Sequence, residues 1–390
     1  MKINTQTLIF TTIAFLVLSL RVAKCQRIDT LVNVGSYRLH FNILKGEGMP
    51  ILFENGSGAD GTMWDTILKP LSDITHATLI TYDRAGFGKS ELDTTNDEID
   101  KHGIINGMQG LETGLAKLGY HGNMMLVASS FGGFYAVLYA ARHPVNVKAM
   151  VGVDMNHVSW FTDSFVNAEM TERRKNAASI KSTNLAYYYQ ALNLRTIVDL
   201  LRKTPFPAAI PAIDLVSAYN FPDSVYAARW KVSHQQFAAA RPNRESITAT
   251  ECGHVIFRDN PLIVVGAIVK AYTATMTESA AGYDIGKRFV TYSIGASNDQ
   301  KRAEVAFRHS AEDLVSWGTA LLQKDSTIKA LEIFKLNVLL HKDDAYAYEK
   351  LGEAYEQAGK KGAAIENFRQ SLLLKPDNAN IKSRLQKLLP

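Results

Sequence analysis

Residues 124–133 constrain the fold most, because they join an apolar strand to a helical stretch through a short serine-containing turn. In this turn Ala128 and Gly132 flank Ser130 in the pattern small-x-Ser-x-small. A serine on such a sharp turn stands at the carboxyl edge of a sheet, and its strained backbone requires small neighbours. The motif predicts an α/β fold with Ser130 as the candidate nucleophile. Ser129 is the rival, but it lies one residue too early for the pattern.

The chain up to about residue 280 alternates short apolar runs with helical stretches. Near-continuous apolar runs indicate strands buried on both faces, and intervening helices indicate parallel pairing. We therefore expect an α/β domain over 26–280 with a mostly parallel sheet. The stretch 159–207 has helical spacing and no clear strand, so we interpret it as a helical cap inserted over the sheet edge. Strands are predicted over 39–44, 50–54, 77–82, 124–128, 149–153, 209–216 and 247–250, and a helix over 135–143.

Composition narrows the classes of protein and site. The chain has 390 residues and is 46% hydrophobic, which suits two globular domains and excludes wholesale disorder. Two cysteines cannot form a disulfide framework or a Cys-rich zinc site. No residue cluster has metal-ligand spacing and no glycine-rich phosphate loop is present, so neither a metal nor a cofactor is expected. The net charge of +5 is concentrated at the N-terminus, and the basic stripe that nucleic-acid binding would need is missing.

Residues 1–25 are typical of a secretory signal. Lys2 precedes the apolar run 8–20, which is too short for a comfortable membrane span. Cleavage after Cys25 would give a secreted or periplasmic mature chain with no membrane span. A lipid anchor on Cys25 is less favoured, because Lys24 stands where a small residue is expected. An uncleaved anchor helix is the other alternative.

Two segments before the serine turn carry a resemblance. Asn55-Gly-Ser-Gly58 follows a predicted strand, and residues 82–90 read Tyr-Asp-Arg-Ala-Gly-Phe-Gly-Lys-Ser. With the Ser130 turn, these segments resemble the α/β-hydrolase superfamily, and the resemblance extends over about 26–275. It implies an oxyanion hole made by the backbone N–H of Phe131 and an N–H of the 55–58 loop, for which Ser57 is the candidate. An ordinary Asn-Gly turn is the alternative for that loop.

The resemblance also implies a general base late in the chain. His254 follows the predicted strand 247–250 and precedes a helical stretch, which is the usual context of the catalytic histidine in this superfamily. His234 and His157 are the competitors. His234 lies in a helical stretch with aromatic neighbours and is interpreted as a packing residue. His157 follows a strand end and is a candidate pocket residue.

Two aspartates are candidates for the acid that orients the base. Asp223 follows the penultimate strand by a few residues, lies 31 residues before His254, and is the preferred candidate. Asp154, at the end of the strand 149–153, is the alternative acid. Asp214 lies inside a predicted strand and is expected to point into the packed sheet.

The C-terminal part, 306–390, contains a repeat with an offset of 34 residues. It resembles the tetratricopeptide pattern, in which small residues let two antiparallel helices approach closely. Residues 281–305 are interpreted as a linker. The matching positions are Trp317 and Leu351, Gly318 and Gly352, Leu321 and Tyr355, Ala330 and Ala364, and Phe334 and Phe368, with Pro376 closing the second copy.

Taken together, the resemblances imply a serine hydrolase with a C-terminal helical-repeat domain. The substrate would be a small acyl compound, with carboxylic esters as the default, and the repeats could bind a protein partner. A peptidase or an acyltransferase of the same fold is an alternative. The other is an inactive platform whose repeats do the binding, since Ala128 stands where the superfamily usually has glycine.

Overall fold

The computed structural model describes residues 26–389 with gaps. Residues 1–25, most of residues 281–305 and Asp223 lie outside the described residues, so the predicted secretory signal, linker and preferred acid fall there. The described ranges are 26–219, 221, 224–276, 281–282, 284–286, 288–289, 292, 311–323, 327–341 and 343–389.

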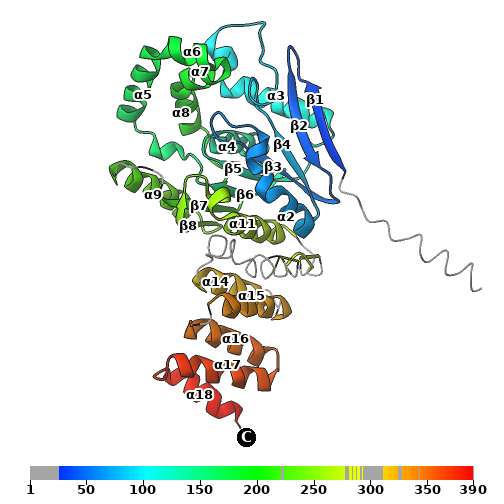
Figure 1. Ribbon diagram of the computed structural model, residues 1–390, viewed down its shortest axis with the longest axis vertical. Helices are drawn as coiled ribbons and strands as arrows, with labels where there is room; N and C mark the ends of the chain where they lie inside the picture. The colour runs from blue at the N-terminus through cyan, green and yellow to red at the C-terminus, as the bar shows by residue number, and fades with distance from the viewer. Residues whose placement is uncertain are drawn as a thin grey trace, which may run out of the picture.

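Eight strands form one sheet in the order β1-β2-β4-β3-β5-β6-β7-β8 (Figure 1). The pairs β1–β2 and β2–β4 are antiparallel, and from β4 to β8 every neighbouring pair is parallel. The expected mostly parallel sheet is therefore confirmed. The strands are β1 (Arg27–Asn33), β2 (Arg38–Leu44), β3 (Gly48–Glu54), β4 (Ala77–Tyr82), β5 (Met124–Ser129), β6 (Val147–Val153), β7 (Ala212–Tyr219) and β8 (Arg244–Gly253).

Strand β1 was not predicted, for a physical reason. It is an edge strand with mostly exposed residues, and its sequence Arg-Ile-Asp-Thr-Leu-Val-Asn has no continuous apolar run. It is held as a strand by pairing with β2 over the whole of Arg27–Asn33, and this pairing cannot be predicted from its own sequence. By contrast, every residue of β4 and β5 is buried, which matches their near-continuous apolar sequences.

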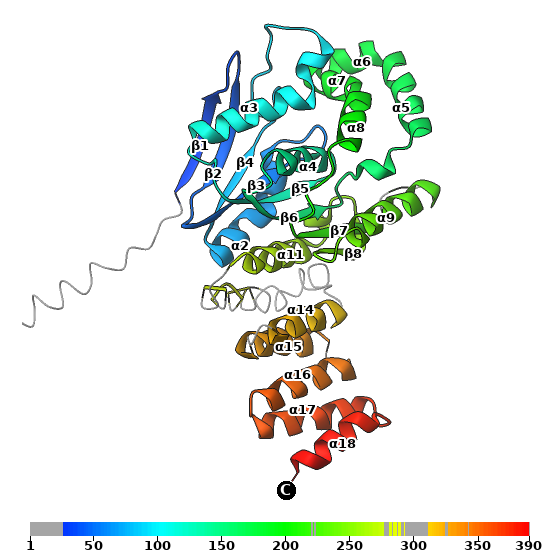
Figure 2. The same ribbon diagram turned by 180° about the vertical axis from the view of Figure 1, so that it is seen from behind.

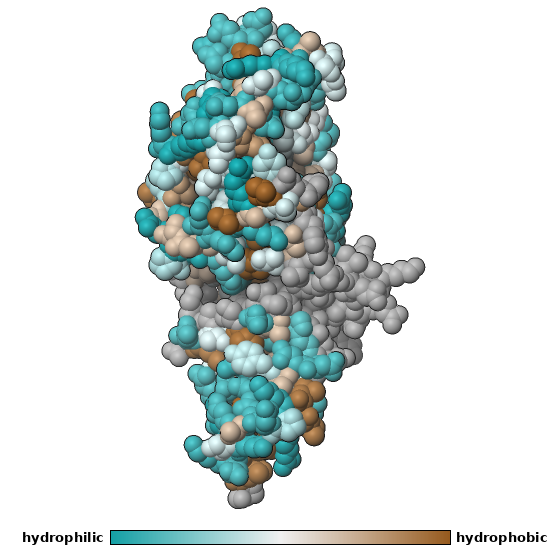
Figure 3. Space-filling view, turned by 90° about the vertical axis from the view of Figure 1, so that its left-hand side faces the viewer, coloured by the Kyte–Doolittle hydropathy of each residue, from teal (hydrophilic) through white to brown (hydrophobic). Residues whose placement is uncertain are grey.

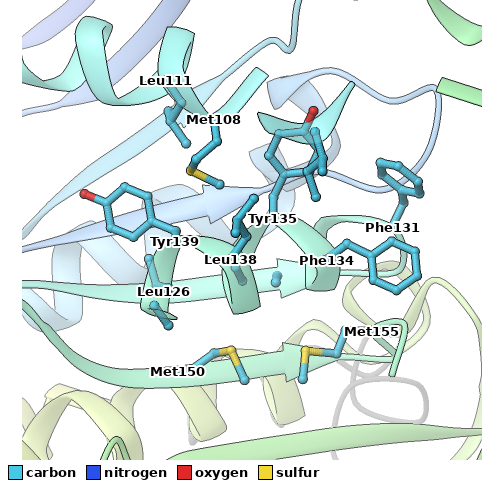
Figure 4. Packing of buried hydrophobic residues seen from close by; sticks show 14 of the residues in the cluster. Met108, Leu111, Leu126, Phe131, Phe134, Tyr135, Leu138, Tyr139, Met150 and Met155 are labelled. Atoms are coloured by element: carbon cyan, nitrogen blue, oxygen red, sulfur yellow. The ribbon is translucent and has the colours of Figure 1, made fainter. Parts of the chain in front are cut away.

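Helices cover both faces of the sheet (Figures 1 and 2). On one face, α3 (Ile104–Lys117) and α4 (Gly132–Arg142) pack against β2, β4 and β5 through the aromatic and aliphatic cluster seen in Figure 4. On the other face, α2 (Asp65–Thr75) and α11 (Pro261–Ala274) bury a second apolar cluster. Burial on both faces holds the central parallel strands in place, and so fixes where their carboxyl ends lie.

Four helices fill the segment between β6 and β7, and no strand falls among these described residues. They are α5 (Asp163–Lys175), α6 (Ala177–Thr183), α7 (Leu185–Leu192) and α8 (Leu194–Arg202), preceded by the short η3 (Val158–Trp160). Figures 1 and 2 show them grouped at one edge of the sheet. Trp160 and Phe161 are buried in the sheet core, whereas Tyr187 is exposed, so these aromatic residues divide between packing and surface.

The C-terminal helices repeat with the offset seen in the sequence. The bounds of α14 (Ala311–Gln323) recur 34 positions later as those of α16 (Ala345–Gln357). The bounds of α15 (Thr327–Leu340) recur in the same way as those of α17 (Lys361–Leu374). A final helix, α18 (Ala379–Leu388), packs on α17. Leu314 and Ile333 belong to the same apolar cluster as residues of α2 and α11, and Ile285 and Phe289, from the segment between α11 and α14, are also members.

The glycine of each helix pair is required by close packing. A Cβ on Gly318 would lie 2.5 Å from the Phe334 ring, and a Cβ on Gly352 would lie 2.5 Å from the Phe368 ring. The equivalent contact thus recurs in both pairs at the 34-residue offset.

Replacing Gly352 by alanine is expected to destabilise the C-terminal helices by about 1–3 kcal/mol, because the buried Phe368 ring must move. The matched control is Gly362→Ala in α17, where the added Cβ meets nothing within 4 Å. The control should be neutral or stabilising by up to about 1 kcal/mol. Urea denaturation followed by circular dichroism measures both, and equal effects of the two substitutions would contradict the packing argument.

None of the described helices is long and apolar enough to cross a bilayer. On the face shown in Figure 3, hydrophobic residues are scattered among hydrophilic ones.

Candidate active site

Ser130 lies directly after β5, on the turn that opens α4, as the sequence motif predicts. Its φ of 51° is in the left-handed region, which is strained for a residue with a side chain. The turn is pressed against the end of β3, because a Cβ on Gly132 would lie 2.4 Å from the backbone oxygen of Glu54. Only glycine fits there. The Ser130 carbonyl also accepts a hydrogen bond from the N–H of Asn156 at 2.8 Å, which ties the turn to the loop after β6.

Asp154 follows β6 and is fully buried, with a φ of 48°. Its Oδ1 accepts hydrogen bonds from the Ser217 N–H and the Trp230 Nε1–H, both at 2.8 Å. Its Oδ2 accepts the Ser217 hydroxyl at 2.8 Å. A buried carboxylate with this many hydrogen-bond donors is held in one orientation.

His254 follows β8 and meets Asp154. Its Nδ1 lies 2.7 Å from the Asp154 Oδ2. The loop that carries it is held by the Gly253 N–H, which donates to Asp259 at 2.8 Å. The His254 side chain is 37% exposed, whereas that of Asp154 is completely buried. With the proton on Nδ1 donated to the carboxylate, Nε2 is the nitrogen left to act as a base.

The topology explains why these residues share one edge of the sheet. Strands β5, β6, β7 and β8 are adjacent and parallel, so their carboxyl ends point the same way. Ser130, Asp154 and His254 each follow one of these strands directly.

The structure pairs His254 with the second of the two predicted acids. Asp223, the preferred candidate, lies outside the described residues, so its role stays a prediction. The Nδ1 nitrogen that it would have to meet already has Asp154 as its partner. Sequence spacing favoured the loop after β7, but the acid that contacts His254, Asp154, follows the preceding strand, β6.

The predicted oxyanion loop lies beside the serine turn. A Cβ on Gly56 would be 3.6 Å from the Ser130 Cβ, so this loop lies next to the Ser130 side chain. The candidate donors are the N–H groups of Ser57 and Phe131, and within the described part of the chain neither donates to another protein group. The Ser57 hydroxyl accepts a hydrogen bond from Gln190 of the cap helix α7.

Arg84, from the 82–90 segment, holds the 55–58 loop through hydrogen bonds. It is buried, and its guanidinium donates to the backbone oxygens of Asn55, at 2.7 Å, and of Gly56. The rings of Phe131 and Tyr135 lie 5.5 and 5.2 Å from the guanidinium carbon. One side chain thus connects the 55–58 loop with the residue after Ser130.

Glu54, at the end of β3, is a buried acid next to Arg84. Its carboxylate lies 4.0 Å from the guanidinium and accepts the Tyr82 hydroxyl at 2.9 Å. Burial raises the pKa of Glu54 to about 8, since desolvation outweighs the opposing effects of Arg84 and Tyr82. The Glu54 side chain is therefore mostly protonated at neutral pH and does not neutralise Arg84. The positive charge of Arg84 then interacts with the backbone carbonyls of the 55–58 loop.

This shift of pKa predicts a pH-dependent stability. Between the ordinary value of 4.5 and about 8, the folded chain keeps a proton on Glu54 that the unfolded chain has released. The free energy of unfolding should therefore fall as the pH rises through this window and level off above it. Glu54→Gln removes the titration, so its pH slope should be flatter than that of the wild type. Urea titrations at about pH 5 and about pH 8 measure the difference, and parallel slopes would contradict the assignment.

A second cluster lies behind Asp154, and the sequence did not predict it. The His157 Nε2 and the His234 Nδ1 lie 2.8 and 2.7 Å from the same oxygen, Oδ2 of Asp214. All three side chains are buried. Asp214 does point into the packed interior, and His234 does pack against aromatic rings, as expected.

This cluster is the one set of His, Cys, Asp and Glu side chains in the described ranges that could hold a metal ion. Both ring nitrogens, however, converge on a single carboxylate oxygen at the distances of N–H···O hydrogen bonds. We therefore interpret it as an imidazole–carboxylate–imidazole chain. Burial opposes ionisation of Asp214, but the two imidazoles outweigh it and hold the pKa of Asp214 below its usual range.

A cavity of about 340 Å³ opens between the cap and the serine turn. Phe131 lines it from the turn, while Tyr189 and Gln190 line it from α7. The Tyr189 ring stacks on His102 with centroids 3.8 Å apart. A smaller cavity of about 260 Å³, lined by His157 and Phe237, lies on the other side of α4.

Comparison with known proteins agrees with this geometry. Residues 49–181 match the family model described as alpha/beta hydrolase fold. The chain is an enzyme with the α/β-hydrolase fold. The matched range contains Ser130 and Asp154 together with the oxyanion loop.

Two curated relatives are similar over different lengths. The uncharacterized protein YqjL of Bacillus subtilis is 22% identical over 236 residues, which is 60% of this chain and 88% of the relative. The cis-3-alkyl-4-alkyloxetan-2-one decarboxylase of Shewanella oneidensis is 30% identical over 114 residues, which is 29% of this chain and 34% of that enzyme.

Two solved structures are also similar. A thermophilic esterase from Thermogutta terrifontis is 18% identical with a TM-score of 0.47, covering 65% of this chain and all of its own. A putative lipase from Acinetobacter baumannii is 15% identical with a TM-score of 0.46, covering 70% of this chain and 97% of its own. At this level of similarity they say nothing of the substrate of this chain.

Proposed function

We propose that this protein is a serine hydrolase that cleaves carboxylic esters through Ser130, His254 and Asp154. One observation carries the proposal. The imidazole of His254 is held at 2.7 Å by a buried carboxylate, at the sheet edge where Ser130 stands in a strained left-handed turn. A base oriented by an acid and placed with a strained serine is the arrangement that acyl transfer needs.

In the proposed reaction, Nε2 of His254 takes the Ser130 proton as the hydroxyl oxygen attacks the ester carbonyl carbon. Asp154 stabilises the imidazolium that forms. The N–H groups of Phe131 and Ser57 donate to the oxyanion of the tetrahedral intermediate. The intermediate collapses as His254 protonates the leaving alcohol. Water, activated by the same nitrogen, then attacks the acyl-enzyme and releases the acid and free Ser130.

The cavity between the cap and the serine turn is the candidate site for part of the substrate. Phe131 and Tyr135 supply apolar surface, while Arg84, Gln190 and His102 supply polar groups. This mixture suits an acyl or alcohol group that carries a hydrogen-bond acceptor. Esters remain the default class, because an alkoxide leaves with the least assistance.

A series of p-nitrophenyl esters of increasing acyl length tests the proposed function. Release of p-nitrophenol should show a burst equivalent to the concentration of active sites wherever deacylation is slower than acylation. Product analysis with and without an added alcohol separates hydrolysis from transfer to an acceptor. Absence of turnover across the series, with a folded protein, would contradict an esterase.

The proposal also covers the ends of the chain. The recurring Gly–Phe contacts at a 34-residue offset support the assignment of 306–390 as tetratricopeptide repeats with a peptide-binding role. Residues 1–25 carry the pattern of a secretory signal, which supports a secreted or periplasmic enzyme. Mass spectrometry of the mature N-terminus from a secreting host tests the leader, because cleavage after Cys25 predicts Gln26 as the first residue.

A further inference from the structure

His234, on α9 (Ser224–Ala239), lies between two buried carboxylates. Its Nδ1 meets Asp214 at 2.7 Å. Its Nε2, on the opposite side of the ring, lies 4.0 Å from the Oδ1 of Asp154 and has no hydrogen-bond partner among the described residues. The ring therefore connects the interior cluster with the acid that holds His254.

The remaining surroundings of His234 are uncharged or directed elsewhere. Its ring packs against the rings of Trp230 and His157, at 5.1 and 4.5 Å between centroids. On β8, Arg244 stacks on Phe237, and on α9 itself, Arg229 stacks on Trp160. Glu245, also on β8, pairs with Lys270 at 2.6 Å. Among the described groups, the charges that act on His234 are those of Asp214 and Asp154.

We propose that His234 is a positioning residue of the triad. Its protonated ring lies between Asp214 and Asp154 and partly offsets the negative charge of Asp154 that acts on His254. The proposal rests on the proposed function, in which Asp154 and His254 act together. A buried cation between two carboxylates satisfies both charges, and two buried carboxylates without one would repel each other.

The pKa directions agree with this geometry. Burial opposes protonation of His234, but the charge of Asp214, its hydrogen bond and the charge of Asp154 outweigh burial and raise the pKa of the ring. His157 behaves differently, because burial outweighs its contact with Asp214 and lowers its pKa. The shared carboxylate Asp214 thus contacts one imidazole whose pKa is raised and one whose pKa is lowered.

The proposal predicts a shift in the pH profile. A cation beside Asp154 weakens the stabilisation of the protonated, inactive form of His254, so the base works at lower pH. Replacing His234 by glutamine removes this cation. The acid limb of kcat/KM for a p-nitrophenyl ester should then move to higher pH by roughly 0.5–1 unit. Asp214→Asn removes the group that keeps His234 charged and should move the limb in the same direction.

The matched control is His157→Gln. It removes a buried imidazole from the same carboxylate, but one whose pKa is lowered by burial and whose hydrogen bond goes to Asp214. The acid limb of this variant should stay in place. An acid limb that moves equally in His157→Gln and His234→Gln would overturn the proposal, since general loosening of the cluster would then be the cause. Thermal melts of all three variants check that they fold.

A measurement on the unmodified enzyme keeps the proposal falsifiable if the variants misfold. In histidine-labelled protein, the nitrogen resonances assigned to His234 should show the imidazolium form at neutral pH. A neutral ring would overturn the proposal. A pH profile that changes after dialysis against EDTA would also overturn it, because a bound metal would then carry the charge. Lack of ester turnover in the wild type would instead defeat the proposed function, and the resonances would still decide the charge of His234.

Discussion

Replacing Ser130 by alanine is expected to lower kcat/KM for an activated ester by on the order of 10⁴-fold or more. The reason is that alanine cannot form the acyl-enzyme, and what remains comes from the oxyanion donors and substrate binding alone. The substitution should not destabilise the fold, since it removes one hydroxyl from a partly exposed turn residue. Steady-state kinetics on a p-nitrophenyl ester together with a thermal melt measure both effects.

Ser129→Ala is the matched control. Ser129 is the last residue of β5 and is buried, one position before the turn, so its hydroxyl is not presented at the sheet edge. This variant should retain activity within a few-fold of the wild type. If Ser129→Ala abolished turnover and Ser130→Ala did not, the assignment of the nucleophile would be wrong.

Asp154→Asn is expected to lower kcat by on the order of 10³- to 10⁴-fold. Asparagine keeps the size of the side chain, but it removes the charge that stabilises the imidazolium of His254 and no longer selects the tautomer with a free Nε2. Asparagine also has one acceptor oxygen where aspartate has two, so the N–H groups of Ser217 and Trp230 lose acceptor capacity. Some loss of stability will therefore accompany the loss of rate.

Asp223→Asn is the control that separates the two candidate acids. Because the Nδ1 of His254 is held by Asp154, this substitution should leave kcat within a few-fold of the wild type. A large loss of rate in Asp223→Asn with little change in Asp154→Asn would show that Asp223 orients the base.

Local sequence patterns were sufficient for most of the sheet and for the turn that carries Ser130. The strands β4 and β5 are mostly apolar runs whose residues are all buried. The turn at Ser130 could be predicted because its strain demands small neighbours at 128 and 132. Strand β1 could not be predicted, because its order comes from pairing with β2 and not from its own apolar pattern.

The acid and the second cluster depend on tertiary contacts that no local pattern reveals. Asp154 and His254 are 100 residues apart, and an aspartate after a strand is a common loop residue in any α/β protein. His157, Asp214 and His234 come from a loop, a strand and a helix, and each of them alone reads as an ordinary buried or packing residue. Spacing along the chain therefore ranked Asp223 first, although the sheet order brings β6 and β8 to the same edge.

The repeat shows the opposite case. A helix pair is a local structure, so the 34-residue offset of its large and small residues predicted the matching helix bounds. The residues at the Gly–Phe contacts are the ones that the pattern had aligned, because close helix approach is what selects them.

The most direct test of the account is to label the folded protein with a fluorophosphonate and to map the adduct by peptide mass spectrometry. The reagent traps a serine whose proton is removed by a neighbouring base. The account predicts one adduct per chain, on Ser130, that is absent from His254→Ala. An adduct on another serine, or no adduct on a folded protein that is otherwise intact, would contradict it.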